Sequence, residues 1–191
     1  NRDIGGGISS YEVVHQIAKQ RSSADGRDRR FDVTLLINGL PIAQIELKQV
    51  TAKDGIYQAF NQVKKYAEEG VFRNNIFSTL QFFVVSNEQT TRYFANALPK
   101  NMHRKLLFSW RTKNNQKVEN LYEFCKQVLN IPDAHRLIAD YTIVSEDQDN
   151  KILMVLHPYQ IHAIEALYVS ANKHESGYVW HATGAIVSLQ N

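Results

Sequence analysis

The sequence predicts a mixed α/β fold, in which a sheet that contains an antiparallel hairpin is flanked by helices. Two apolar and β-branched runs, at residues 31–37 and 42–48, are separated by Asn38-Gly39-Leu40-Pro41, which is a strong hairpin signal. Residues 54–69 carry apolar side chains at helical spacing, and Gly70 then favours a stop. Strands mixed with helices in this way are typical of an α/β domain.

The other expected elements are shorter runs of the same two kinds. Residues 11–17 alternate loosely and fit either a strand or the end of a helix. The remaining apolar runs predict strands at 80–85, 151–156 and 177–181, and helical periodicity predicts helices at 121–129 and 159–171.

Composition excludes several classes of protein. The chain has 191 residues, of which 43% are apolar and 21% charged, so wholesale disorder is excluded. No run approaches the roughly 18 apolar residues of a membrane helix. Cys125 is the only cysteine, which excludes an intrachain disulfide and favours a reducing cytoplasm. A change of composition near residues 140–150 predicts a boundary between a domain at 1–145 and a second one that begins at 146–191.

Positive charge is concentrated in one part of the chain. Residues 89–118 contain seven basic residues and no acidic one, with aromatic residues between them. Such a block is expected either on a path for nucleic-acid phosphates or on a solvated face. The basic residues are Arg92, Lys100, Arg104, Lys105, Arg111, Lys113 and Lys117.

The hairpin places acidic and basic side chains where they could meet. Glu46 and Lys48 share one face of the second strand because strand residues alternate. A two-residue loop at Asn38-Gly39 would pair Asp32 with Ile45 and point it away from Glu46. A three-residue loop that includes Leu40 would pair Asp32 with Glu46, and both loops are permitted.

In the second register, two carboxylates lie side by side and require neutralisation. A divalent cation with oxygen ligands, of which Mg²⁺ is the natural choice, would supply it. Lys48 could then orient a water molecule or stabilise charge that develops on a phosphate. The alternative is an amphipathic hairpin whose polar face is only solvated.

Asp32 followed by Glu46-Leu47-Lys48 resembles the PD-(D/E)xK signature of restriction-endonuclease-like nucleases. The longer stretch Arg30–Thr34 and Asn38–Lys48 resembles the restriction (motor, R) subunit of type I restriction–modification enzymes, as do five further segments. These are residues 59–66, 83–87, 91–96, 158–160 and 177–184, in the order of the family. The proline that precedes the first Asp in the signature is absent, since Arg30-Phe31 stand there.

The resemblance implies a restriction-endonuclease-like sheet and a nuclease site. Asp32, Glu46 and the Leu47 carbonyl would bind Mg²⁺, and Lys48 would be the catalytic lysine. Gln62 and Tyr66 match a Q-x-x-x-Y motif that supports the site and the DNA; their spacing of four places them on one helix face. The neighbouring Lys64 and Lys65 could contact DNA phosphates or be solvated.

The same resemblance implies an ATP motif at the start of a helicase-like (RecA-type) domain. Gln160 in Pro158-Tyr159-Gln160 would read adenine, since an amide can both donate and accept. Thr183-Gly184 would begin the phosphate-binding loop, but the Gly-Lys-Thr that the loop requires is missing. ATP binding is therefore expected only of a complete subunit. The start at Asn1, without methionine, also predicts that an N-terminal part is missing.

The expected function is Mg²⁺-dependent cleavage of double-stranded DNA by the nuclease domain of a type I motor subunit. ATP-driven translocation would come from the rest of the subunit. Methyltransferase and specificity subunits would be its partners, without any membrane. The alternative is an assembly or DNA-docking module with the same fold that cuts nothing, and it is favoured if Asp32, Glu46 and Lys48 do not converge.

Overall fold

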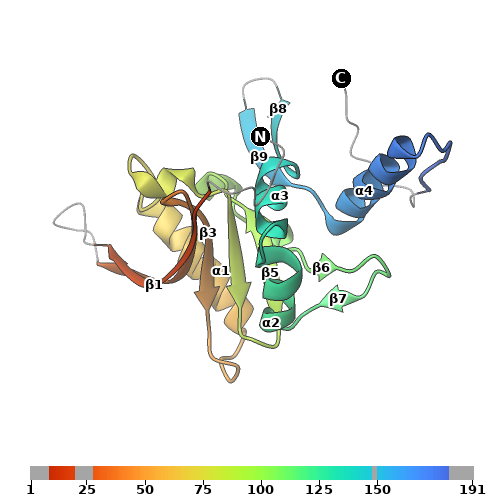
Figure 1. Cartoon of the computed structure of the whole chain (residues 1–191). Helices are drawn as coiled ribbons and strands as arrows, with labels where there is room; N and C mark the ends of the chain where they lie inside the picture. Colours follow the sequence, from red (N-terminus) through yellow and green to blue (C-terminus); the bar gives the residue numbers. More distant parts are fainter. Residues whose placement is uncertain (1–8, 20–27, 148–149, 181–191) are drawn as a thin grey trace.

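A five-stranded mixed sheet forms the centre of the protein (Figure 1). The computed structural model describes residues 9–19, 28–147 and 150–180. Neighbouring strands are antiparallel except for β3 and β4, which are parallel. The strands, in their order across the sheet, are β1 (Tyr11–Lys19), β2 (Arg29–Ile37), β3 (Leu40–Leu47), β4 (Phe82–Ser86) and β5 (Thr91–Ala95). The mixed α/β class predicted from the sequence is confirmed.

Helices cover both faces of this sheet, and two small hairpins accompany them. Helix α1 (Gly55–Glu68) provides the crossover from β3 to β4. The later helices are α2 (Leu121–Phe124), a π-helical turn at Cys125–Leu129, α3 (Asp133–Ala139) and α4 (Pro158–Asn172). The hairpins are β6 (Trp110–Arg111) with β7 (Lys117–Val118), and β8 (Thr142–Asp147) with β9 (Asn150–Val155).

The β2–β3 hairpin combines a two-residue turn with a bulge. Asn38 and Gly39 both have positive φ, of 52° and 77°, and Ile37 pairs with Leu40 across them. The register then shifts by one residue, so that Leu35 pairs with Ala43 and Ile42 is the extra residue of β3. The loop is therefore the shorter of the two expected lengths. The bulge nevertheless gives the register expected of the longer one.

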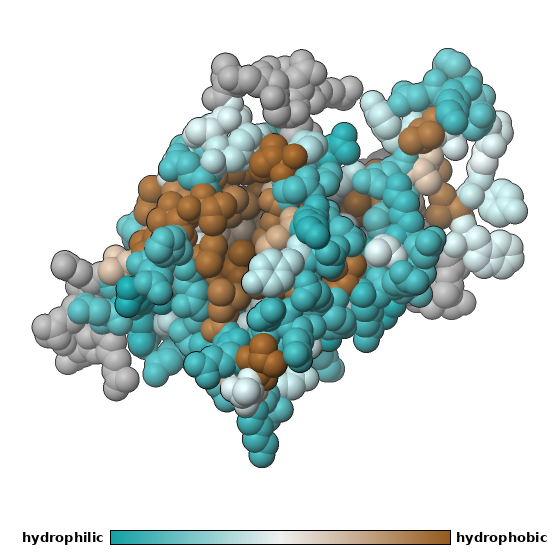
Figure 2. All heavy atoms as spheres, turned by 60° about the horizontal axis from the view of Figure 1, so that its bottom comes forward, coloured by the Kyte–Doolittle hydropathy of each residue, from teal (hydrophilic) through white to brown (hydrophobic). Residues whose placement is uncertain are grey.

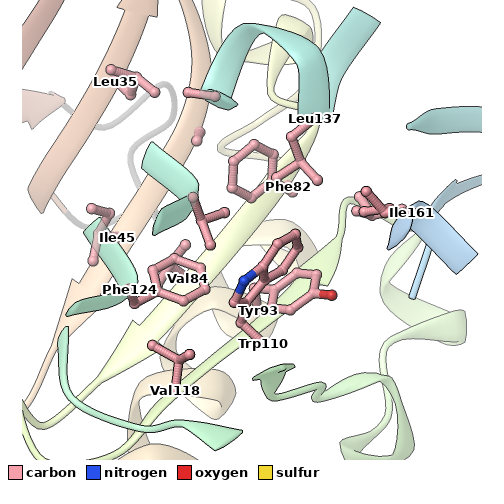
Figure 3. Packing of buried hydrophobic residues seen from close by; sticks show 14 of the residues in the cluster. Leu35, Ile45, Phe82, Val84, Tyr93, Trp110, Val118, Phe124, Leu137 and Ile161 are labelled. Carbon is pink, nitrogen blue, oxygen red and sulfur yellow. The ribbon is translucent and has the colours of Figure 1, made fainter. Parts of the chain in front are cut away.

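Each face of the sheet has its own hydrophobic core. On the α1 face, Phe60 and Val63 pack against Phe83, Phe94 and their neighbours. On the other face, side chains of α2, α3 and α4 pack on the sheet. Figure 3 shows Tyr93, Trp110 and Phe124 packed beside Val84 in this second core. The outer surface is mainly hydrophilic in the view of Figure 2, with apolar side chains gathered in limited areas.

The C-terminal part differs from expectation at one strand. Residues 177–180 form no strand, and the side chains of Tyr178 and Trp180 are 85% and 87% exposed, so the prediction of a strand at 177–181 is wrong for the four residues that the structure describes. The expected boundary at 145/146 falls inside β8, and Val155 and Ile161 join the core of the sheet. A helicase-like domain that starts here stays a prediction. None of the described helices is long and apolar enough to cross a membrane.

Candidate active site

Asp32 and Glu46 meet where β2 and β3 lie side by side. Val33 pairs with Ile45, and the same register places Asp32 opposite Glu46. The backbone N–H of Leu47 donates to Oδ2 of Asp32 at 2.8 Å, which fixes this carboxylate against β3. The first requirement of the predicted nuclease site, two carboxylates on one side of the hairpin, is met.

Lys48 completes the cluster and connects it to helix α1. Its Nζ lies 3.3 Å from Oε1 of Glu46 and donates to Oε1 of Gln62 at 2.5 Å. The amide nitrogen of Gln62 donates in turn to the hydroxyl of Tyr66. The two helical residues point together because they are four apart on one face of α1. A single chain of polar contacts therefore runs from Glu46 through Lys48 and Gln62 to Tyr66.

Tyr66 is the fixed end of this chain. Its side chain is buried, and its ring packs edge-on against Phe31, with a centroid distance of 5.6 Å. The guanidinium of Arg29 lies over the same ring, 5.4 Å from its centroid, and forms an ion pair with Glu69. Burial raises the pKa of Tyr66, so the hydroxyl stays protonated at neutral pH. Packing thus fixes the residue that holds Gln62.

Glu46 has an unusual environment for a carboxylate. Its side chain is fully buried, and its pKa is raised from 4.5 to about 7, first by burial and next by the charge of Asp32, while Lys48 acts in the opposite direction. Its Oε2 has no hydrogen-bond partner among the described residues. An ionised buried oxygen without a partner is costly, so this position requires a proton or a cation.

The donors available here suit a hard cation. Two carboxylates and the Leu47 carbonyl that lies between Glu46 and Lys48 are oxygen ligands, which Mg²⁺ or Ca²⁺ prefers. Within the described ranges, no group of three or more His, Cys, Asp or Glu side chains is placed to hold a metal ion. A cation held by Asp32 and Glu46 would thus keep several coordination positions for water or substrate.

Comparison with known proteins identifies the family. Residues 7–102 match the family model described as "Type I restriction enzyme R protein N terminus". The chain belongs to this family. A type I restriction enzyme endonuclease subunit of Staphylococcus aureus (strain COL) is 37% identical over 171 residues, and one of Staphylococcus saprophyticus is 40% identical over 171 residues. Each alignment covers 89% of this chain and 18% of the relative.

A third relative is shorter. The EcoprrI endonuclease subunit of Escherichia coli is 34% identical over 154 residues, which cover 80% of this chain and 48% of that protein. The chain therefore spans less than half the length of these curated relatives. The expected membership of the type I R-protein family is confirmed.

The R-protein fold also brings together polar side chains to which the sequence analysis assigned no role. Thr34 and Gln44 are paired residues of β2 and β3, and both are fully buried. Oγ1 of Thr34 and both amide atoms of Gln44 find no partner in the part of the chain that the structure describes. Gln44 precedes Glu46 by two residues and so lies on its face of β3. A polar residue two positions before Glu46, inside an otherwise apolar strand, is the feature of the sequence that could have indicated Gln44.

The two lysines next to the Q-x-x-x-Y motif lie on the outside of α1. Nζ of Lys64 is 3.9 Å from Oε1 of Glu68, and Lys65 is exposed. Neither contacts the Glu46–Lys48–Gln62–Tyr66 chain. Their contact with DNA stays a prediction.

The basic block is divided between surfaces. Arg92 and Arg104 line a cleft at the start of α1, whereas Arg111 contacts His162 of α4 through its carbonyl and Lys113 lies 3.5 Å from Glu165 of α4. Arg92 also forms an ion pair with Glu119. The remaining basic side chains are exposed, namely Lys100, Lys105 and Lys117. A DNA path over the whole block stays a prediction.

Gln160 has a structural contact in this protein. It is the third residue of α4, and its Oε1 accepts from the backbone N–H of His157 at 2.8 Å, as part of a capping box. The side-chain amide oxygen of Gln160 therefore stabilises the start of α4. Thr183 and Gly184 lie outside the described residues, so nucleotide binding stays a prediction.

Proposed function

We propose that this chain is the DNA-cleaving part of a type I restriction enzyme R protein and hydrolyses phosphodiester bonds with the help of Mg²⁺. The observation that carries the proposal is the buried Glu46 carboxylate, whose Oε2 has no partner in the described residues, beside Asp32 and in contact with Lys48. A buried carboxylate beside a second carboxylate destabilises a fold unless a proton or a cation neutralises it. The pairing of Asp32 with the buried Glu46 is explained if these carboxylates bind a cation.

Each residue of the site would have a separate role in the reaction. Asp32, Glu46 and the Leu47 carbonyl would hold Mg²⁺, which when bound neutralises the carboxylates and lowers the pKa of a bound water molecule. The Lys48 ammonium, held by Glu46 and Gln62, is placed to orient an attacking water molecule or to stabilise negative charge on the phosphate. Tyr66 fixes Gln62, so the position of Nζ is set before DNA binds.

The longer protein would supply the other activities. The relatives are named endonuclease subunits of type I restriction enzymes, and this chain spans 18% of the Staphylococcus proteins. We propose that ATP-dependent translocation on double-stranded DNA resides in the rest of such a subunit. The specificity and methyltransferase subunits of the same complex would be its partners, and its compartment would be the cytoplasm.

Nicking of supercoiled plasmid DNA tests the proposal. The protein is incubated with Mg²⁺, and wild type is compared with Lys48→Ala, Glu46→Gln and Lys151→Ala. Lys151 is an exposed lysine of β9 that pairs with Glu146, so it controls for the loss of one charge. We expect nicking by wild type and Lys151→Ala and none by the two site variants.

Two outcomes would contradict cleavage at this site. Equal nicking by all four proteins would place the activity elsewhere, including in a contaminant. DNA binding without nicking by the protein and by its complete R-protein complex would favour the non-cleaving docking module instead.

A further inference from the structure

A cleft of about 370 Å³ opens beside the candidate active site, at the start of helix α1. Gly55 and Asn87, from the two chain segments that flank Lys48, contribute to its lining. A β-carbon at Gly55 would lie 3.3 Å from Cβ of Lys48 and 3.7 Å from Cβ of Asn87. The backbone N–H of Lys48 donates to the carbonyl of Ser86, directly before Asn87. The cleft is therefore a continuation of the catalytic edge of the sheet.

Arg104 is an exposed cation of this cleft. Its guanidinium lies over the ring of Tyr57, 4.3 Å from the centroid, and both side chains are exposed. Among the described residues, no carboxylate forms an ion pair with Arg104. Stacking on the ring orients the guanidinium and leaves its N–H edge free, which is the geometry that binds phosphate oxygens in pairs.

Other groups that line the cleft are Arg92 and the first residues of α1. Arg92 lines the cleft but is already paired with Glu119 and bonded to the carbonyl of Thr91, so its charge is largely neutralised. Helix α1 begins here without a side-chain cap and without an acidic residue in its first turn. The positive end of the helix dipole lies at the cleft, and no side-chain hydrogen bond caps it.

One acidic group opposes this field. Asp54 also lines the cleft, and it is the residue that precedes α1, in a left-handed conformation with φ of 54°. Its backbone carbonyl accepts a hydrogen bond from the N–H of Gln58, and its side chain does not cap the helix. Asp54 would repel an anion bound to Arg104, so removing the Asp54 charge should strengthen anion binding.

We infer that this cleft is a subsite for a backbone phosphate of DNA that neighbours the phosphate to be cut, and that Arg104, stacked on Tyr57, is its principal binding residue. The inference rests on the proposed function, because it takes DNA as the substrate of Lys48 and its neighbours. It separates Arg104 from the rest of the basic block. Of the seven cations, this one combines a position in the cleft that Gly55 connects to Lys48 with a guanidinium that has no acidic partner among the described residues.

Binding of labelled duplex DNA, followed by fluorescence anisotropy across a salt series without divalent cation, tests the subsite. A contact to one phosphate contributes a slope of about 0.9 to the dependence of log K on log salt. Arg104→Ala should therefore flatten the slope by about one unit and weaken binding about eightfold at about 0.1 M salt, with the difference disappearing towards about 1 M.

The control is the adjacent residue. Lys105 is equally exposed, and Lys105→Ala removes the same charge outside the cleft lining. Its slope should match the wild type. Tyr57→Ala should weaken binding and leave the slope unchanged, Tyr57→Phe should behave as wild type, and Asp54→Asn should strengthen binding at low salt.

Plasmid nicking run on the same proteins separates the two proposals. If the wild type nicks DNA but Arg104→Ala and Lys105→Ala have equal slopes, the subsite is refuted and the proposed function stands. If Arg104→Ala flattens the slope and no protein nicks DNA, phosphate binding in the cleft is supported and cleavage is not. A wild type that neither binds nor nicks DNA overturns both.

Discussion

Replacing Glu46 by glutamine should stabilise the metal-free protein at alkaline pH. The pKa of Glu46 is raised from 4.5 to about 7, chiefly by burial and next by Asp32. The folded protein therefore holds the carboxyl proton more tightly than the unfolded chain does. The stability contributed by the protonated group is fully present below about pH 4.5 and is lost as the pH rises through about 7.

The size of the effect follows from the pKa shift. A displacement of about 2.5 pH units, at about 1.4 kcal/mol for each unit, corresponds to about 3 kcal/mol. Glutamine keeps the size of the side chain but cannot ionise. The free energy of unfolding of Glu46→Gln minus that of wild type should thus increase by about 3 kcal/mol between pH 4.5 and pH 8.

Urea unfolding at several pH values in EDTA measures this difference. Glu123→Gln serves as the control, since Glu123 is half exposed and, among the described residues, its carboxylate forms an ion pair only with Lys126. Adding Mg²⁺ at pH 8 should stabilise wild type and leave Glu46→Gln nearly unchanged, because a ligand stabilises only the state that binds it. Parallel pH profiles for Glu46→Gln and wild type would refute the assignment of a raised pKa to this carboxyl.

Three further variants test other parts of the argument. Gln62→Leu should lower nicking by about 10- to 100-fold without changing DNA affinity, because Lys48 loses the partner that orients it; Gln58→Leu, one turn earlier on α1, is the matched control, and equal losses would contradict the reasoning. Gly39→Ala should destabilise the protein by about 1 kcal/mol in urea unfolding, since its φ is +77°, whereas Gly177→Ala should cost nothing measurable. Phe124→Ala should cost about 3–5 kcal/mol by the same measurement, because the side chain is fully buried in the second core, and a loss below about 1 kcal/mol would show that this core is not formed as described.

The candidate site was predictable because its chemistry is local in sequence. Glu46 and Lys48 are two residues apart on one strand, and the turn residues Asn38-Gly39 fix where that strand begins. Helical spacing then placed Gln62 and Tyr66 on one side of α1. The sequence could not give the position of α1 on the sheet, and thus the contact between Gln62 and Lys48, because this depends on the parallel pairing of β3 with β4.

The bulge in β3 could have been predicted from Pro41, although not from the alternation of apolar and polar side chains. Pro41 has no backbone N–H, so it cannot complete the hydrogen-bond ladder of a strand with neighbours on both sides. β3 is a central strand whose pairing with β4 begins at Ala43, and its register shift against β2 comes directly after Pro41. A proline in a central strand therefore predicts a bulge. The bulge brings Asp32 opposite Glu46 in spite of the two-residue turn.

The expected strand at 177–181 is wrong for its described residues, and the shared surface expected of the basic block stays a prediction, because both depend on spatial information. The apolar residues at 177–180 resemble a strand, but an isolated extended segment has no partner for its backbone groups, and none of the described strands lies beside it. The basic residues at 92–117 are close in sequence, yet the chain folds them onto the α1 cleft and onto the α4 side. Proximity in sequence predicts a shared surface only within one element.

The polar face that β2 and β3 share is explained better by the proposed function than by the needs of folding. Thr34, Gln44 and Glu46 are fully buried beside apolar cores, and each has a side-chain atom without a partner in the described structure. Each such atom costs about 1–3 kcal/mol relative to a bonded one, and apolar residues at these positions would remove that cost. Unsatisfied polar groups of this kind are rare in folded proteins and concentrate where a ligand or ordered water completes them. These side chains lie on the same face of the sheet as the position where Asp32, Glu46 and Lys48 meet. A cation bound there, together with a phosphate, would provide a partner for the Glu46 carboxylate.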